Sequence, residues 1–131
     1  MRATISKEFR FEAAHRLPNV PPDHKCSRLH GHSFLVTIRV DGMVDESVGW
    51  VVDFALISKA MRPIIDQLDH QYLNEIPGLD NPTSENIAKW IWDHVVTSNI
   101  IIPISVSVSE TCTTRCEYYG QYIARCPKRL W

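Results

Sequence analysis

The chain has 131 residues, of which 44% are apolar and 22% charged, and this length and balance are typical of one compact domain spanning residues 1–131. Fourteen Lys and Arg residues against fifteen Asp and Glu residues give a formal net charge of −1, which argues against nucleic-acid and anionic-membrane partners. No apolar run approaches the roughly eighteen residues of a membrane helix, and Met1–Arg10 carries charges where a secretory signal would be apolar. We therefore expect a cytoplasmic protein.

Two strands joined by a proline-rich loop open the predicted fold. Residues alternate between apolar and polar over Ile5–His15, as expected for a strand with one buried face. The loop from Arg16 to about Leu29 contains prolines that exclude a helix or a central strand. A second alternating run covers His30–Val40 and closes at Asp41-Gly42, a turn signal.

Two helices follow. Asp53 is a candidate N-cap, and an apolar stripe after it runs to Leu68. Pro63 lies inside this stripe, so we expect a kink or an early end of the regular helix there. Thr83 is the predicted N-cap of the second helix, with Glu85 favourably placed in its first turn.

Two further strands complete the pattern. The stretch Ile104–Glu110 has the clearest period-two alternation in the chain, and a final strand is expected around Cys116–Ile123. The order ββααββ predicts an α+β fold, a four-stranded antiparallel sheet with two helices packed on one face. The edge strands of such a sheet need protection, and pairing with other subunits is one way to provide it.

Three histidines form the main candidate site. His30 and His32 lie about 7 Å apart along one strand, with Gly31 between them, so both imidazoles can reach one ion. His15 ends the preceding strand on its apolar face, and antiparallel pairing would bring it beside them. Three His ligands without a fourth protein ligand are typical of a catalytic zinc site. Three ordinary polar residues at strand ends remain the alternative.

Cys26 lies in the proline-rich loop between Lys25 and Arg28, two cations that favour a thiolate. A reactive thiol and a small buried thiol are both compatible with this pattern.

Two acidic positions are further candidates. Asp69 precedes His70 and can orient its imidazole for proton transfer, although both residue types also end helices. Glu110 continues the apolar face of its strand, where a carboxylate is costly without a partner. A cationic or amide-like ligand is one such partner, and escape of the side chain to solvent is the alternative.

Other His and Cys residues carry weaker patterns. His24 and His94 lack a partner at ligand spacing and are interpreted as a surface and a half-buried histidine. Cys112 and Cys116 have no second pair nearby, so they are interpreted as spare thiols rather than a structural zinc site.

Five motifs in order resemble the 6-pyruvoyl-tetrahydropterin synthase superfamily over nearly the whole chain. They are FEAAH at 11–15, CSRLHGH at 26–32, LDH at 68–70, NPTSE at 81–85 and ET at 110–111. The C-x3-H-G-H form is similar to the 6-carboxytetrahydropterin synthase branch of queuosine biosynthesis. The tail from Arg125 to Trp131 matches none of these motifs.

The resemblance implies a tunnelling fold (T-fold), in which subunit sheets join into an oligomeric barrel and two rings stack, a hexamer arranged as a dimer of trimers. Active sites are then expected between subunits, so that Cys26, His70 and Glu110 need not serve the metal of their own chain.

The resemblance also implies a function and roles for the residues. The expected reaction converts 7,8-dihydroneopterin triphosphate to 6-carboxytetrahydropterin, with release of acetaldehyde and triphosphate. Zinc would be held by the three histidines. The other expected roles are Cys26 as base, His70 oriented by Asp69 as acid, Glu110 on the pterin edge, Thr83 and Ser84 as further pterin donors, and Lys25 and Arg28 on the triphosphate.

Two other functions stay open on the sequence. One is formation of 6-pyruvoyltetrahydropterin by the same residues, and the other is a zinc-stabilised binding or assembly module without catalysis.

Overall fold

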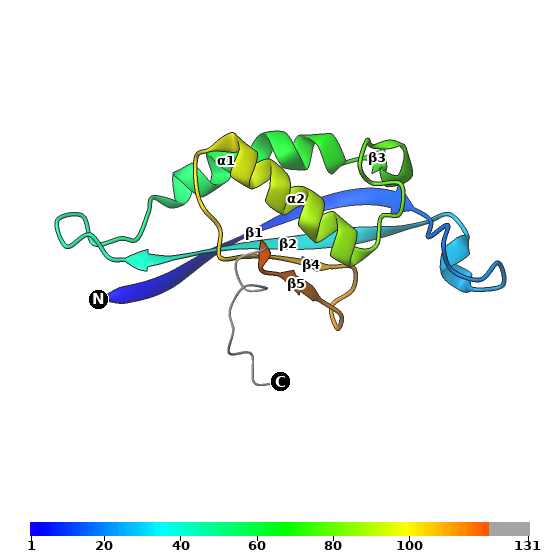
Figure 1. Ribbon diagram of the computed structural model, residues 1–131, viewed down its shortest axis with the longest axis horizontal. Helices are drawn as coiled ribbons and strands as arrows, with labels where there is room; N and C mark the ends of the chain where they lie inside the picture. The colour runs from blue at the N-terminus through cyan, green and yellow to red at the C-terminus, as the bar shows by residue number, and fades with distance from the viewer. Residues whose placement is uncertain (121–131) are drawn as a thin grey trace.

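The computed structural model describes residues 1–120, which form a five-stranded sheet with two helices on one face (Figure 1). Two long strands, β1 (Arg2–His15) and β2 (His30–Met43), make the central hairpin. They pair antiparallel along their whole length, so the last residue of β1 faces the first residue of β2. The predicted α+β class is confirmed, and both strands extend beyond their predicted bounds.

One face of this hairpin forms the floor of the core. Alternation along the strands buries Phe11 and Ala13 of β1 and Phe34 and Ile38 of β2. Phe11 and Phe34 are opposite each other in the ladder, and their rings stack with centroids 4.7 Å apart. The three candidate histidines continue this face at one end of the hairpin.

The first helix, α1 (Phe54–Leu68), begins as predicted after Asp53, whose carboxylate accepts a hydrogen bond from the Ala55 N–H at 2.9 Å. The expected early end at Pro63 is wrong, because the helix continues through Pro63 to Leu68. Pro63 lacks the N–H that would serve the carbonyl of Lys59. Lys59 is exposed, so water can serve that carbonyl instead.

The second helix, α2 (Ser84–Ser98), confirms the predicted cap. Oγ1 of Thr83 accepts a hydrogen bond from the Asn86 N–H at 3.1 Å, and Glu85 lies in the first turn. The helix ends at Asn99, which adopts the left-handed conformation with φ of 57°.

The sheet has one strand more than predicted, and it is mixed. The strand order is β3-β1-β2-β4-β5, with β4 at Ser105–Ser109 and β5 at Cys116–Tyr118. The added strand β3 (Gln71–Tyr72) runs parallel to β1, which corrects the purely antiparallel four-stranded expectation. β3 forms because His70, with φ of 59°, turns the chain after α1, and its N–H bonds the carbonyl of Glu12 in β1 at 2.6 Å.

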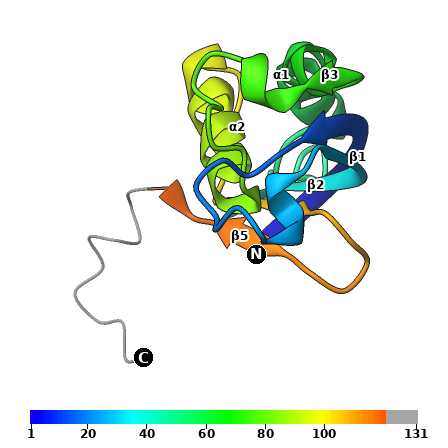
Figure 2. The ribbon, with the colours of Figure 1, turned by 90° about the vertical axis from the view of Figure 1, so that its right-hand side faces the viewer.

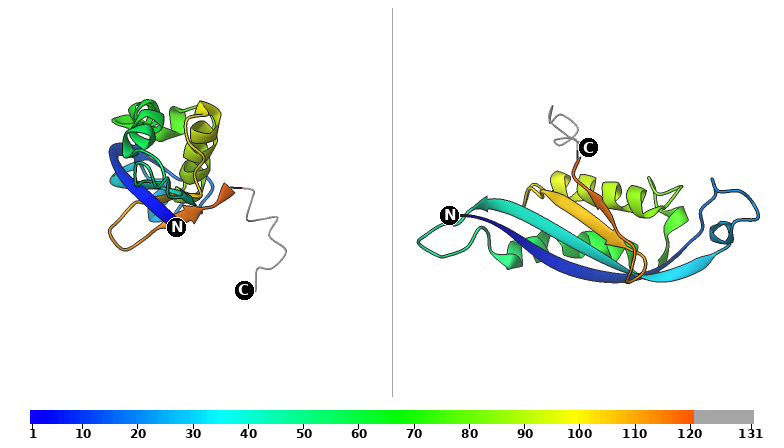
Figure 3. Two further views of the ribbon diagram at one scale, coloured as in Figure 1. Left: turned by 90° about the vertical axis from the view of Figure 1, so that its left-hand side faces the viewer. Right: turned by 90° about the horizontal axis from the view of Figure 1, so that it is seen from below.

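Both helices lie over the same face of the sheet, as the end-on view shows (Figure 2). The opposite face is seen from below in Figure 3, right, where no described helix covers it. Short 3-10 turns at Lys25–Ser27 and Leu73–Glu75 lie in the connections. None of the helices in residues 1–120 is long and apolar enough to cross a membrane.

The predicted strand Cys116–Ile123 is observed as β5 up to Tyr118. Its last three residues, like the tail from Arg125, lie outside the described part of the chain.

Candidate active site

The strand register brings the three histidines together. His15 and His30 are direct ladder partners, and His32 faces Ala13, two residues before His15 on the same face of β1. The imidazole centroids are 4.6 Å apart for His15 and His30, 5.2 Å for His15 and His32, and 4.9 Å for His30 and His32. One ring nitrogen from each lies within 4.8 Å of the other two, close enough for all three to bind one ion.

Backbone carbonyls orient two of these rings. Nδ1 of His15 lies 2.8 Å from the carbonyl oxygen of Pro82, and Nδ1 of His30 lies 2.7 Å from that of Arg28. A carbonyl oxygen only accepts, so each Nδ1 carries the proton and each Nε2 keeps its lone pair. Ligating histidines are characteristically held in this way by their second nitrogen.

Burial favours the neutral forms of His15 and His32. His15 is fully buried, and burial lowers the pKa of both His15 and His32 below the ordinary value for histidine. Nε2 of each is buried and has no hydrogen-bond partner within residues 1–120. Neutral imidazoles with unused buried lone pairs fit a divalent metal ion, because a buried polar atom without a partner is costly.

Glu110 stands beside this cluster in the same chain. It directly follows β4, in line with the buried Val106 and Val108, and its side chain is one-quarter exposed. Oε1 of Glu110 lies 3.9 Å from Nε2 of His15, and Oε2 lies 3.8 Å from Nε2 of His32. Glu110 therefore faces the histidines rather than open solvent.

A pocket of about 360 Å³ opens on the other side of Glu110. Its lining residues come from the start of α2 and from the β4–β5 connection: Ser84, Glu85, Glu110, Thr114, Arg115 and Cys116. The structure thus brings the candidate Ser84 to Glu110. Thr83 does not line this pocket, and its hydroxyl oxygen serves the helix cap instead.

Cys26 lies in the 3-10 turn of the loop between β1 and β2. Its side chain is half-buried and its thiol is free, while the flanking Lys25 and Arg28 are exposed. The carbonyl of Cys26 accepts from the Leu17 N–H at 2.8 Å, which ties the turn to the start of the loop. The cluster of ligand atoms within 4.8 Å contains the three imidazoles and not the Cys26 thiol.

Asp69 holds His70 against β1. Oδ1 of Asp69 accepts from the Glu12 N–H at 2.9 Å, and Oδ2 lies 3.0 Å from Nδ1 of His70. The bond from the Glu12 N–H, followed by the one from His70, lowers the pKa of Asp69, which is therefore ionised at neutral pH. An ionised partner assigns the Nδ1 proton to His70 and leaves Nε2 available for proton exchange.

His70 and His32 line the same open groove of about 620 Å³. The groove also contains Glu12 and Ser33, whose hydroxyl donates to the Glu12 carboxylate at 2.7 Å. The His70 side chain is 77% exposed, so it can reach a ligand in this groove.

Sequence reasoning missed several participants. The carbonyls of Pro82 and Arg28 and the backbone of Glu12 leave no trace in a side-chain pattern. Cys116, interpreted as a spare thiol, lines the pocket beside Glu110, and burial, with Glu85 and Glu117 nearby, raises its pKa. His24 is exposed and His94 is half-buried, as predicted.

Comparisons with known proteins agree with this architecture. The sequence model of the family described as 6-pyruvoyl tetrahydropterin synthase matches residues 4–121. The 6-carboxy-5,6,7,8-tetrahydropterin synthase of Synechocystis sp. is 42% identical, over 88% of this chain and 92% of the relative. The dihydroneopterin monophosphate aldolase of Pyrococcus furiosus is 37% identical, over 72% of this chain and 76% of the relative. The structure of Caenorhabditis elegans 6-pyruvoyl tetrahydropterin synthase superposes with a TM-score of 0.83 at 27% identity, over 92% and 96% of the two chains.

The fold and the histidine cluster together define a T-fold protein with three imidazoles arranged for a metal ion. The chain belongs to the 6-pyruvoyl tetrahydropterin synthase family. Its resemblance to the 6-carboxytetrahydropterin synthase branch of that family is confirmed by relatives of that name, and the chain is accordingly an enzyme.

Proposed function

We propose that this protein is a zinc-dependent lyase that converts 7,8-dihydroneopterin triphosphate and one water molecule to 6-carboxytetrahydropterin, releasing acetaldehyde and triphosphate, in cytoplasmic queuosine biosynthesis. The observation that carries the proposal is the position of the Glu110 carboxylate between two unpartnered imidazole nitrogens and a pocket of about 360 Å³. The name of the Synechocystis relative supports the reaction. The proposal treats residues 1–131 as a single catalytic domain.

The three histidines would hold the metal, His15 and His30 through the Nε2 atoms that their Nδ1–carbonyl bonds leave unprotonated. A zinc ion bound there supplies Lewis acidity toward the side-chain hydroxyls of the substrate. The carbonyls of Pro82 and Arg28 would keep the rings of His15 and His30 in the ligating orientation.

Proton transfer is assigned to two further side chains. Cys26, half-buried in the loop that leads to His30, would take the proton next to the pterin ring as a thiolate. His70 would return or relay protons through Nε2, because Asp69 fixes its tautomer. Neither side chain needs to ligate the metal for this role.

Glu110 and the adjoining pocket would bind the pterin. The pterin edge presents adjacent N–H donors, which pair with a carboxylate through two charge-assisted hydrogen bonds. Ser84, at the N-terminus of α2, lines the same pocket and can add a donor. The hydroxyl oxygen of Thr83 accepts the cap bond from the Asn86 N–H, so its hydroxyl hydrogen can still be donated to the pterin. The exposed cations Lys25 and Arg28 remain the proposed contacts of the triphosphate.

Assembly into a homo-oligomer, a hexamer built as a dimer of trimers, is part of the proposal. In residues 1–120, β1 pairs with β3 only at Ala13 and Ala14, and the Glu12 backbone bonds Asp69 and His70, so the part of that edge before Glu12 offers free backbone groups. Strands of neighbouring subunits would pair with them. In this proposal Glu110 acts at the histidines of its own chain rather than at those of a neighbouring subunit, because its carboxylate already faces His15 and His32.

Product analysis tests the function. The zinc-loaded protein is incubated with 7,8-dihydroneopterin triphosphate, and the products are identified by mass spectrometry. We expect 6-carboxytetrahydropterin, acetaldehyde and triphosphate. Formation of 6-pyruvoyltetrahydropterin instead would assign the activity of the other branch.

A second candidate reaction is favoured by the Pyrococcus relative, a dihydroneopterin monophosphate aldolase. Supplying dihydroneopterin monophosphate in a parallel reaction distinguishes it. Turnover of the monophosphate without turnover of the triphosphate would replace the proposed function by an aldolase.

A further inference from the structure

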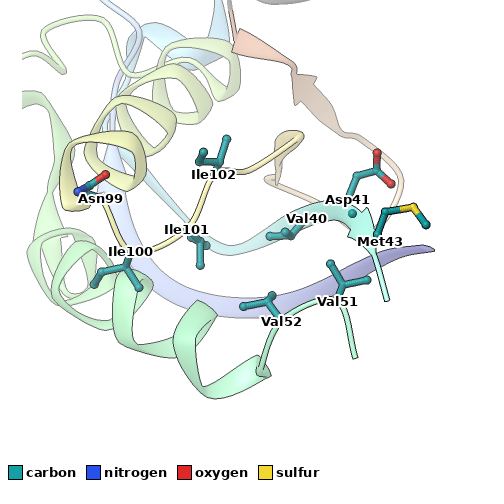
Figure 4. A pocket seen from close by; sticks show the side chains of 10 residues that line it. Val40, Asp41, Met43, Val51, Val52, Asn99, Ile100, Ile101 and Ile102 are labelled. Carbon is teal, nitrogen blue, oxygen red and sulfur yellow. The ribbon is translucent and has the colours of Figure 1, made fainter. Parts of the chain in front are cut away.

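An apolar groove lies at the end of the molecule far from the histidines. It consists of two adjoining hollows of about 470 and 410 Å³ that share Asp41 and Ile102 as lining residues. Figure 4 shows the first hollow, bordered by side chains of β2, of Val51 and Val52, and of the segment after α2. The second hollow continues past Ile102 to other lining residues: Arg2, Trp92, Pro103, Ile104 and Tyr119.

The walls of this groove expose large apolar side chains. Ile102 is 77% exposed, Met43 66% and Ile104 39%. Covering such side chains is favourable by roughly 25 cal/mol for each Å² of apolar surface removed from water. A groove of this kind therefore favours an apolar occupant.

The described chain ends at the groove itself. Tyr119 lines the second hollow, and Gly120 packs directly against the indole of Trp92, another lining residue. A Cβ at Gly120 would lie 2.2 Å from Cζ2 of Trp92, and φ at Gly120 is +66°, so only glycine fits this turn. The described part of the chain therefore ends beside the groove.

The chain that follows has the composition to occupy it. The family match ends at residue 121, so residues 122–131 extend beyond the family domain. Their sequence, YIARCPKRLW, places two apolar residues at each end and contains no acidic residue. Ten residues span up to roughly 33 Å when extended, which is enough to run along adjoining hollows of this size.

We propose that the C-terminal segment, residues 121–131, docks into this groove of its own chain and covers Ile102. The segment is tethered at Gly120, so its effective concentration at the groove is high, on the order of millimolar for a short linker. Weak apolar contacts then suffice for binding. This role is independent of the reaction proposed above.

Hydrogen exchange followed by mass spectrometry tests the proposal, comparing the full chain with a chain that ends at Gln121. We expect amides of residues 100–104 to exchange at least tenfold faster in the shortened chain. Exchange of residues 24–29, on the loop near the histidines, should be unchanged, and so should the circular dichroism. Equal exchange of residues 100–104 in both chains would overturn the proposal.

A matched variant separates apolar docking from the mere presence of a tail. Tyr122, Ile123, Leu130 and Trp131 are all replaced by Ser, which keeps the length and charge of the segment. This variant should exchange like the shortened chain. Retained protection would show that apolar contacts do not hold the segment and would overturn the proposal.

Mixed samples identify whose tail occupies the groove. Shortened chains labelled with ¹⁵N are mixed with unlabelled full-length chains, and exchange is read on the labelled chains alone. Fast exchange at residues 100–104 in the mixture supports docking within one chain. Recovered protection would mean that a neighbouring copy supplies the segment, which contradicts the proposal.

Discussion

Nδ1 of His15 donates a hydrogen bond to the carbonyl oxygen of Pro82 at 2.8 Å. This bond joins the end of β1 to the residue before the Thr83 cap of α2, two segments far apart in the sequence. It also fixes the ring so that the lone pair of the buried Nε2 can bind a metal ion. The position of α2 and the geometry of the cluster are therefore coupled.

We expect about one zinc ion per chain, bound by the three imidazoles with a fourth position open. His32→Ala should lose both metal and activity while the fold survives, since an open site contributes less to folding than a closed structural one. Metal analysis and circular dichroism check this. Global unfolding of the variant would indicate a structural metal instead.

Cys26→Ala should keep its metal and bind the pterin but lose turnover, because a base acts in the transition state. Cys112→Ala is the matched control, since Cys112 is an exposed free thiol outside the lining of the Glu110 pocket, and it should leave turnover unchanged. Metal content, ligand calorimetry and steady-state kinetics provide the measurements. Normal turnover of Cys26→Ala would remove the assigned role.

Glu110→Gln should weaken pterin binding far more than the fold. Replacing two charge-assisted bonds by one neutral bond and an amide that faces a donor costs roughly 2 to 4 kcal/mol, about thirty-fold or more in affinity. The free energy of unfolding should stay level or rise slightly, because Gln is nearly isosteric and its desolvation is less costly. Calorimetry and thermal melts check both. Normal binding with a marked loss of stability would make Glu110 a structural residue.

Asp69 gives a pH dependence of defined sign. Its pKa in the folded protein lies below the ordinary value, so the unfolded chain binds the proton more strongly. The stabilisation is therefore complete above about pH 4, the ordinary value for Asp, and is lost as the pH falls through the lowered pKa. Urea melts of the wild type and Asp69→Asn should converge as the pH is lowered from 5 toward 3. A constant difference over this range would contradict the assignment.

Asp69→Asn should also lower turnover at neutral pH, where it removes the charge that holds the Nδ1 proton on His70. Kinetics at pH 7 check this.

Thr83→Ala should destabilise the protein by about 1 kcal/mol through loss of the cap to the Asn86 N–H. Thr83→Ser keeps a hydroxyl acceptor and should restore most of this loss. Thermal melts of the two variants test the cap. Pterin affinity measured on the same variants tests the separate proposal that Thr83 contacts the ligand.

Local sequence signals determined much of the fold. Period-two alternation predicted β1 and β2, because a strand with one buried face alternates regardless of its partners. Asp53 and Thr83 predicted both helix starts, since a cap acts within three residues of itself. The three histidines were likewise predictable, because hairpin pairing alone places His15 opposite His30.

Contacts between distant segments were decided only by the tertiary structure. The parallel strand β3 depends on the bonds of Asp69 and His70 to Glu12, which no local period encodes. The position of Glu110 beside His15 depends on how far β4 extends along β2. The sequence determined which side chains share a face, because that is a local property of the backbone. Only packing determined which atoms meet across the sheet, because backbone carbonyls and strand offsets leave no mark on residue type.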